Sequence, residues 1–280
     1  MKGTGLPDAT GSCSPAELIS PAMRTSLFAK NIEGFLFELT DLFRFIGLFF
    51  RTLSKRRFER AEFINQLYKT GYKSFFLISV TGLILGLVLT LQTRPMLADL
   101  GAERWLPNLV FVSIIREMSP VIMALLFAGK VGSGIGAELS SMRVTEQIDA
   151  MEVSATNPVN YLVVTRVLAT TIMLPVLVFY ADFIAFMGSF LGLKAYSNIS
   201  FPLFFSQAFD GIYFYDLLPA TLKTFFFGFF IGIISCYKGY YANTGTEGVG
   251  QAANASVVIS SMVIFFIDLV AVQITSLFEI

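Results

Sequence analysis

The sequence predicts an all-α integral membrane protein with about five transmembrane helices and two further amphipathic helices outside the membrane core. Of the 280 residues, 55% are hydrophobic and the mean hydropathy is +0.69. Only 14% are charged, whereas soluble domains average about a quarter. A bilayer core takes about 20 apolar residues as a helix, and several runs of that length are present. Together these features predict a chain that lies mostly in lipid.

Five apolar runs are long enough to cross a bilayer. They cover residues 74–92, 106–128, 167–193, 215–236 and 256–278. The third run contains Pro175 and Asp182. Because proline removes a backbone donor and crowds the preceding turn, we expect this helix to be kinked or interrupted.

The chain before the first span divides into two parts. Residues 1–30 are rich in Gly, Ser and Pro and contain no signal-peptide core, which predicts a flexible tail. Residues 31–62 are predicted to form an interfacial amphipathic helix, because apolar residues recur at helical spacing among charged ones. The charged residues of its first part are Glu33, Glu38, Asp41, Arg44 and Arg51. A short span with charges at its edges is the alternative. Residues 63–280 form the remaining, membrane-spanning domain.

The distribution of Lys and Arg predicts the orientation. Eleven of the twenty precede residue 74, and positively charged segments stay on the cytoplasmic side. The same side gains Lys130, Arg143, Arg166 and Lys238. The opposite side has only Arg94, Arg104 and Lys194. With five spans, the N-terminus is therefore expected in the cytoplasm and the C-terminus outside.

Composition excludes several classes of site. The sequence has no histidine, which rules out Ser-His-Asp hydrolysis, histidine phosphotransfer and histidine-ligated metals. A formal net charge of zero argues against a nucleic-acid partner. Cys13 and Cys236 lie in the polar tail and at the end of an apolar run, so neither a disulfide framework nor a metal site is expected.

The connection between the second and third spans is long, and its sequence has the pattern of regular structure. The connection begins with four closely spaced glycines, Gly129, Gly132, Gly134 and Gly136. They resemble a phosphate loop only superficially, because no strand precedes them and the G-x-x-x-x-G-K order is absent. The favoured interpretation is that small residues let helices approach closely.

A short amphipathic helix is predicted directly after these glycines, in "TEQIDAMEV". Thr145 is an acceptable N-cap, and Asn157-Pro158 ends the segment. Its apolar residues are Ile148, Met151 and Val153, and its charged residues are Glu146, Asp149 and Glu152. The helix either caps the bundle or serves as a docking element for a cytoplasmic partner.

Three stretches of the chain resemble a known family. They are "QLYKTGYKS", "REMSPVIMALLFAGKVGSGIGAELSSMRVTEQIDAMEVSATNPVNYLVVTRVLA" and "GTEGVGQAANASVV". They are similar to the MlaE family, the permease subunits of ABC transporters that move phospholipids between the two membranes of Gram-negative bacteria and maintain outer-membrane lipid asymmetry. The resemblance covers residues 63 to 278, and the E-x-x-x-M-R-x-T-E-Q-I-x-A-M-E block is its most specific part. The first 60 residues resemble the family only in having an N-terminal interfacial helix, not in sequence.

The resemblance implies an assembly in the bacterial inner membrane, with the C-terminus in the periplasm. It implies a homodimer of permeases, two copies of an ABC ATPase that bind ATP and Mg, a hexameric periplasmic MCE-domain protein, and often a STAS-domain protein. The permease itself would be no enzyme and would bind no cofactor, which agrees with the absence of a Walker motif. In the family the segment after the glycines is a coupling helix seated in a groove of the ATPase. The resemblance assigns that contact here to Glu146, Gln147, Asp149, Met151 and Glu152.

Four charged residues lie at membrane depth: Arg116 and Glu117 on the second span, Lys223 on the fourth and Asp268 on the fifth. Adjacent residues leave a helix about 100° apart, so Arg116 and Glu117 need different partners, and the four charges sum to zero. They form either structural salt bridges or the polar lining of a cavity for a lipid headgroup, as matching positions in the family imply. We expect Glu117 and Lys223 to face the cavity and Arg116 and Asp268 to be packed.

Apolar side chains near the end of the first span are candidates for an acyl-chain wall. These are Leu85, Leu89, Leu91, Met96 and Leu100, and flexible Met and Leu side chains accept varied lipid tails.

Two other functions remain open at this stage. In an ion-coupled secondary transporter, Glu117 and Asp268 would carry protons, although five spans without an inverted repeat argue against that class. A membrane-embedded lipid-modifying enzyme would need a carboxylate or lysine as its catalytic group, because histidine is absent.

Overall fold

A computed structural model of the chain describes residues 37–53, 59–196, 199–210, 214–243 and 245–278. Every regular element in these ranges is a helix, which confirms the predicted fold class. The chain divides into two compact units, Met1–Gly47 and Leu48–Ile280. The elements of the second unit from residue 60 onward are α2 (Arg60–Asp99), η1 (Glu103–Trp105), α3 (Leu106–Ser113), η2 (Ile114–Met118), α4 (Ser119–Phe127), η3 (Ala128–Gly132), α5 (Ser133–Val144), α6 (Gln147–Val153), η4 (Val159–Val164), α7 (Thr165–Lys194), α8 (Phe201–Phe209), α9 (Phe214–Tyr240) and α10 (Thr246–Phe278).

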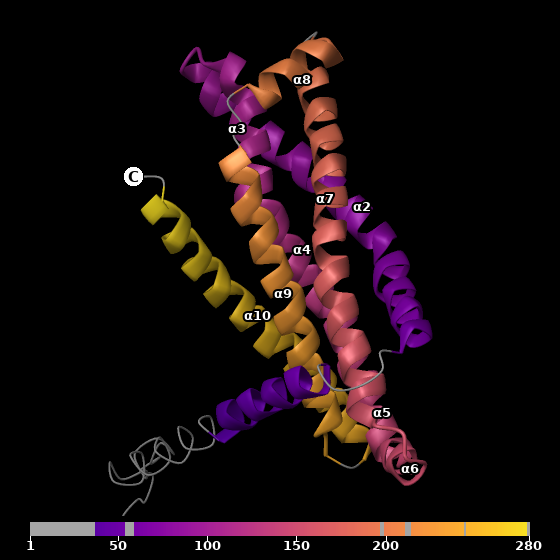
Figure 1. Ribbon diagram of the computed structural model, residues 1–280. Coiled ribbons are helices and arrows are strands. Elements are labelled where there is room, and N and C mark those ends of the chain that lie inside the picture. Colours follow the sequence, from indigo (N-terminus) through magenta and orange to yellow (C-terminus); the bar gives the residue numbers. More distant parts are fainter. Residues whose placement is uncertain (1–36, 54–58, 197–198, 211–213, 244, 279–280) are drawn as a thin grey trace, which may run out of the picture. The chain divides into compact units, whose positions relative to one another are not determined.

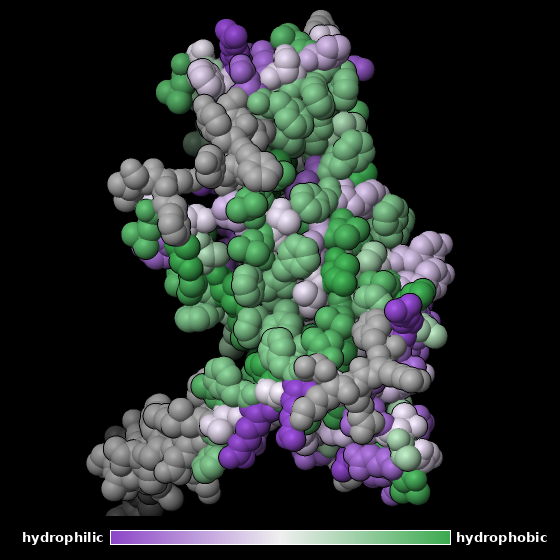
Figure 2. Space-filling view, in the orientation of Figure 1, coloured by the Kyte–Doolittle hydropathy of each residue, from purple (hydrophilic) through white to green (hydrophobic). Residues whose placement is uncertain are grey.

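Five helical segments are long and apolar enough to cross a bilayer, as the sequence predicts. They are Arg60–Asp99, Glu103–Val144, Val159–Lys194, Leu217–Tyr240 and Thr246–Leu277. The second is built from α3, η2, α4, η3 and α5 in succession. Hydrophobic side chains cover the middle of the bundle and hydrophilic ones gather toward its two ends (Figure 2). The chain is therefore a multi-pass membrane protein.

The segment before the first span is only partly described. The predicted tail and residues 31–36 lie outside the described residues. Residues 37–53 are helical, and in the first unit an exposed ion pair of 3.6 Å joins Arg44 Nη1 to Asp41 Oδ1. Because α2 begins at Arg60, residues 60–62 of the segment expected at the interface form its first turn instead. The interfacial position of this helix stays a prediction.

The close packing of α2 on α7 depends on small residues. A Cβ atom added to Gly82 would lie 3.0 Å from the carbonyl oxygen of Ala181, and one added to Gly86 would overlap the backbone of Ala185. Gly188 on α7 approaches the backbone of Leu83 in the same way. Small residues let helix backbones approach to van der Waals contact in a membrane, so α2 and α7 pack as a pair (Figure 1).

The glycines predicted to follow the second span lie inside it, in η3 and α5, so they form no phosphate loop. An added Cβ would meet the Ser235 side chain at Gly132 and the Ser256 side chain at Gly136, whereas Gly129 and Gly134 have open space. The predicted close approach is therefore confirmed for Gly132, which faces α9, and for Gly136, which faces α10.

The third span was expected to be kinked or interrupted, and the interruption is wrong. Helix α7 runs without a break from Thr165 to Lys194, with Pro175 in its interior (Figure 1). Membrane helices tolerate proline because neighbouring helices and local adjustments satisfy the freed backbone groups. Pro175 is buried against such neighbours, so packing holds the helix together.

Helices α3, α7 and α8 meet at one end of the bundle (Figure 1), and phenylalanine rings from all three form a cluster there. The ring of Phe186 on α7 lies 4.9 Å from that of Phe111 and 5.0 Å from that of Phe204 on α8, between centroids. Aromatic pairs at such distances add stabilisation beyond the area they bury. The short helix α8 is therefore fixed to the ends of two spans.

Candidate functional site

A buried lysine joins three membrane spans. Lys223 on α9 donates hydrogen bonds of 2.9 Å to Glu117 Oε2 on η2 and 2.9 Å to Asp268 Oδ1 on α10. The side chain of Lys223 is 5% exposed, that of Asp268 is 19% exposed and that of Glu117 is 45% exposed. We call these three residues the ion cluster.

The electrostatics of the ion cluster explain why its members occur together. A charge inside a membrane protein is costly unless it is paired, and Lys223 is nearly enclosed by protein. Two carboxylates against one ammonium leave a net charge of −1, and Arg116, the neighbour of Glu117 in the sequence, balances the set. The sequence predicted that the four charges could neutralise one another as salt bridges without fixing the pairs, and the structure brings both Glu117 and Asp268 to Lys223.

The expected division of roles among the four charged residues stays a prediction. Glu117 is the most exposed member of the ion cluster, whereas Lys223 is almost fully enclosed by its own chain. Within this chain, Glu117 is the member of the ion cluster that contacts the surroundings, whereas Lys223 lies behind it. A lining role for Lys223 therefore requires that Glu117 or Asp268 moves aside.

A wide helical turn sets the direction of Glu117. In η2 the N–H of Ser119 bonds the carbonyl of Ile114, five residues earlier, which makes this a π-helical turn. Pro120 lies just beyond it. Because Pro120 cannot donate to the carbonyl of Arg116 and its ring crowds that group, a wider turn fits better than an α-turn. Single π-turns occur frequently at functional sites.

The proposed acyl-chain wall does not form one surface in this chain. Leu85 is buried and Leu89 is partly buried in the core cluster that includes Phe186. Met96 and Leu100 are 70% and 78% exposed, respectively. Leu91 is 38% exposed, so only Met96 and Leu100 of the five candidates present most of their surface outward.

The predicted N-cap of the short helix α6 is wrong. The hydroxyl of Thr145 donates to the carbonyl of Ser141, 2.8 Å away, so Thr145 ends α5. Glu146 then takes a left-handed conformation with φ of 58°, and α6 starts at Gln147. Threonine offers its hydroxyl to either helix, and here the carbonyl of the preceding turn takes it.

Helix α6 is anchored by one residue and exposed elsewhere. Ile148 is fully buried, Met151 is half-buried and Val153 is 91% exposed. The remaining predicted contact residues, Glu146, Gln147, Asp149 and Glu152, are all exposed.

Two polar contacts hold α6 against its neighbours. Arg143 Nη1 lies 2.5 Å from Asp149 Oδ1, and the hydroxyl of Tyr240 donates to Glu152 Oε1 over 3.5 Å. The apolar face predicted from the sequence is thus split, because Ile148 packs inward while Val153 faces outward.

A second ion cluster was not predicted from the sequence. Glu138 Oε1 on α5 lies 3.2 Å from Arg166 Nη2 on α7 and 3.4 Å from Lys69 Nζ on α2. Arg166 is 2% exposed. In the sequence, Arg166 and Lys69 stand out only as positive charges on the side predicted to be cytoplasmic. The signal available was Glu138, the first residue of the specific motif.

The described residues contain no group of three or more cysteine, aspartate or glutamate residues that could hold a metal ion. The buried cations Lys223 and Arg166 are instead held by carboxylates.

Comparison with known proteins places the chain in a family. Residues 63–274 match the family model described as "Permease MlaE". The chain is 36% identical over 240 residues to the "Probable ABC transporter permease protein" of Rickettsia prowazekii, covering 86% of this chain and 90% of the relative. It is 32% identical over 241 residues to the "Intermembrane phospholipid transport system permease protein MlaE" of Haemophilus influenzae, covering 83% of this chain and 92% of the relative. The resemblance noted in the sequence is confirmed, and the chain belongs to the permease MlaE family.

Proposed function

We propose that this chain is the permease subunit of an ABC transporter that moves phospholipid between the inner and outer membranes, powered by a separate ATPase. The observation that carries the proposal is the match of residues 63–274 to the permease MlaE family. The Haemophilus relative is named as an intermembrane phospholipid transport permease. Family membership favours this function over an ion-coupled transporter or a lipid-modifying enzyme.

The proposed assembly follows the family pattern. Two copies of the chain lie in the inner membrane, each above one of two ATPase subunits that bind ATP and Mg. A periplasmic MCE-domain hexamer stands on the opposite side, and a STAS-domain protein binds the ATPase. The exposure of α6 supports this arrangement, because its charged residues and Val153 are available for contact while Ile148 fixes the helix to the bundle.

Within the membrane, the ion cluster is the proposed polar contact for the lipid headgroup. A phosphodiester is an anion, and Lys223 is the cation of the cluster. Glu117 is its more exposed carboxylate partner, so a phosphate can replace it at the ammonium group with little further desolvation. Exposed Met96 and Leu100 offer flexible apolar surface for acyl chains.

Reconstitution tests this proposal directly. The permease and its ATPase are incorporated into donor vesicles, and the periplasmic MCE protein links them to acceptor vesicles. Movement of a fluorescent phospholipid between the vesicles is measured with ATP and with a non-hydrolysable analogue. We expect transfer only when ATP is hydrolysed. A complex that hydrolyses ATP at a rate set by lipid yet moves no lipid in either direction would contradict the proposal.

A further inference from the structure

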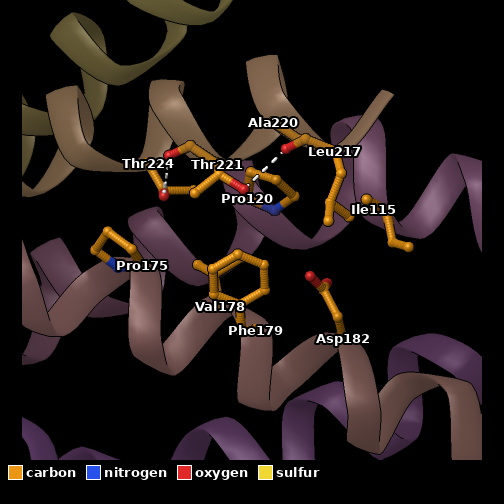
Figure 3. A pocket seen from close by; sticks show the side chains of 10 residues that line it. All are labelled: Ile115, Pro120, Pro175, Val178, Phe179, Asp182, Leu217, Ala220, Thr221 and Thr224. Carbon is orange, nitrogen blue, oxygen red and sulfur yellow. Dashed lines mark hydrogen bonds between the residues drawn. The ribbon is translucent and has the colours of Figure 1, made fainter. Parts of the chain in front are cut away.

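A small pocket lies inside the bundle, apart from the ion cluster, where η2 and α4, α7 and α9 meet (Figure 3). It offers about 10 Å³ to the centre of a water molecule, which is room for about one water. Its lining residues are Ile115, Pro120, Pro175, Val178, Phe179, Asp182, Leu217, Ala220, Thr221 and Thr224.

Asp182 is the one titratable residue among these ten, and the other side chains are apolar except for two threonines. Its Oδ1 atom is buried and accepts no hydrogen bond. The hydroxyl of Ser119 lies beside the carboxyl group, but one neutral hydroxyl does not compensate for burying a full negative charge.

The charged residues on the elements around the pocket do not line it. They are Arg116 and Glu117 on η2, Arg166 and Lys194 near the ends of α7, and Lys223 and Lys238 on α9. Lys223 is held by Glu117 and Asp268, and Arg166 by Glu138. No cation of the described chain therefore lines the pocket to neutralise Asp182.

The two threonines supply acceptors but no free proton. The hydroxyl of Thr221 donates to the carbonyl of Leu217 over 2.8 Å, and that of Thr224 donates to the carbonyl of Thr221 over 2.7 Å (Figure 3). Their oxygen lone pairs remain available. The pocket thus combines an unpartnered carboxyl oxygen with two hydroxyl oxygens whose protons are already donated to the backbone, and the hydroxyl of Ser119 is the neutral donor beside the carboxyl group.

We propose that Asp182 is a proton-binding site, which holds its carboxyl group as a neutral acid at neutral pH and shares the pocket with one water molecule. An isolated carboxylate in an apolar interior is so costly that the group takes up a proton instead. The acid proton and the two protons of the water then satisfy the acceptors around the pocket. This inference does not rest on the proposed transport function.

Infrared spectroscopy of the purified, detergent-solubilised protein tests the proposal. A protonated carboxyl group has a C=O stretching band well separated from the band of a carboxylate. We expect that band in the wild-type protein at neutral pH, with a shift to lower frequency in heavy water. Asp182→Asn should remove it. Absence of the band from the wild-type protein, or its persistence in Asp182→Asn, would overturn the proposal.

A matched control and an isotope label make the assignment specific. Asp268→Asn makes the same change inside another span, where the carboxylate is paired with Lys223, and it should leave the band unchanged. Labelling the aspartate carboxyl carbon with ¹³C in the wild-type protein should move the band without any substitution. This measurement can overturn the proposal even if Asp182→Asn fails to fold, because a band that does not move with the label belongs to no aspartate.

Discussion

Replacing Lys223 with methionine tests whether the ion cluster holds three spans together. Methionine keeps the length of the side chain and removes its charge. The substitution deletes both hydrogen bonds of 2.9 Å and leaves Glu117 and Asp268 facing each other without a cation. Asp268, 19% exposed, has little access to solvent within this chain, whereas Glu117, 45% exposed, has more. Most of the cost should therefore come from Asp268.

The expected loss of stability follows from the burial of these groups. Removing one partner of a buried ion pair costs roughly 3–5 kcal/mol, and the exposure of Glu117 places the estimate at the lower end, about 3 kcal/mol. For a chain of this size each kcal/mol shifts the unfolding midpoint by roughly 2–4 °C. Lys223→Met should therefore unfold roughly 6–12 °C below the wild-type protein.

Cys236 provides the assay, because it is fully buried on α9. A thiol-reactive fluorescent dye labels it only as the bundle opens, in a Cys13→Ser background that removes the other thiol. The matched control combines Lys223→Met with Glu117→Gln and Asp268→Asn, which leaves no stranded charge. Replacing a complete buried ion cluster by neutral groups is often nearly neutral, so this control should recover most of the loss. A wild-type midpoint in Lys223→Met, or an equal loss in the control, would refute the reasoning.

Three further predictions concern other parts of the molecule. Val153→Asp at the exposed tip of α6 should lower lipid-stimulated ATP hydrolysis of the complex roughly tenfold, because docking would bury a new carboxylate. The control Ser154→Asp adds the same charge one residue away and should have a smaller effect. Equal effects of the two variants would contradict the contact assigned to Val153. Gly86→Ala should lower the unfolding midpoint by more than about 4 °C, because the added Cβ overlaps the backbone of Ala185. The control Gly134→Ala places its Cβ in open space and should raise the free energy of unfolding by up to about 1 kcal/mol. Similar midpoints for the two variants would contradict the packing of α2 on α7. A reporter fused after Ile280 should be active only in the periplasm, and cytoplasmic activity would mean that either the number of crossings is not odd or the N-terminus is not cytoplasmic.

The spans could be predicted from the sequence because length and hydropathy are properties of the chain itself. Each of the five predicted runs lies within one of the five membrane-length helical segments, apart from residues 215–216 and residue 278 at the ends of the last two. The start of α2 at Arg60 was harder to predict, because polar residues continue a helix beyond the membrane without any change of pattern. The continuity of α7 through Pro175 also depends on neighbours that the local sequence does not reveal.

The candidate site could be predicted only in part, for a similar reason. That charges in a span must find partners is a local argument, and it identified Glu117, Lys223 and Asp268. Which residues share the surface of the first span depends on packing instead. Leu85 is covered by the core around Phe186, and this contact lies about 100 residues away in the sequence.

The directions in which Glu117 and Glu138 point depend on π-helical turns, which a helical wheel drawn for an ideal α-helix does not include. Glu117 and Glu138 lie on the same long span, 21 residues apart, and an ideal α-helix would place them about 60° apart around its axis. Two π-helical turns, η2 and η3, interrupt the α-helical pattern between Ile114 and Gly132. Each such turn changes the phase of everything beyond it. As a result Glu117 meets α9 and α10, whereas Glu138 meets α2 and α7. One span thereby connects the ion cluster in the membrane to the end of the bundle that carries α6.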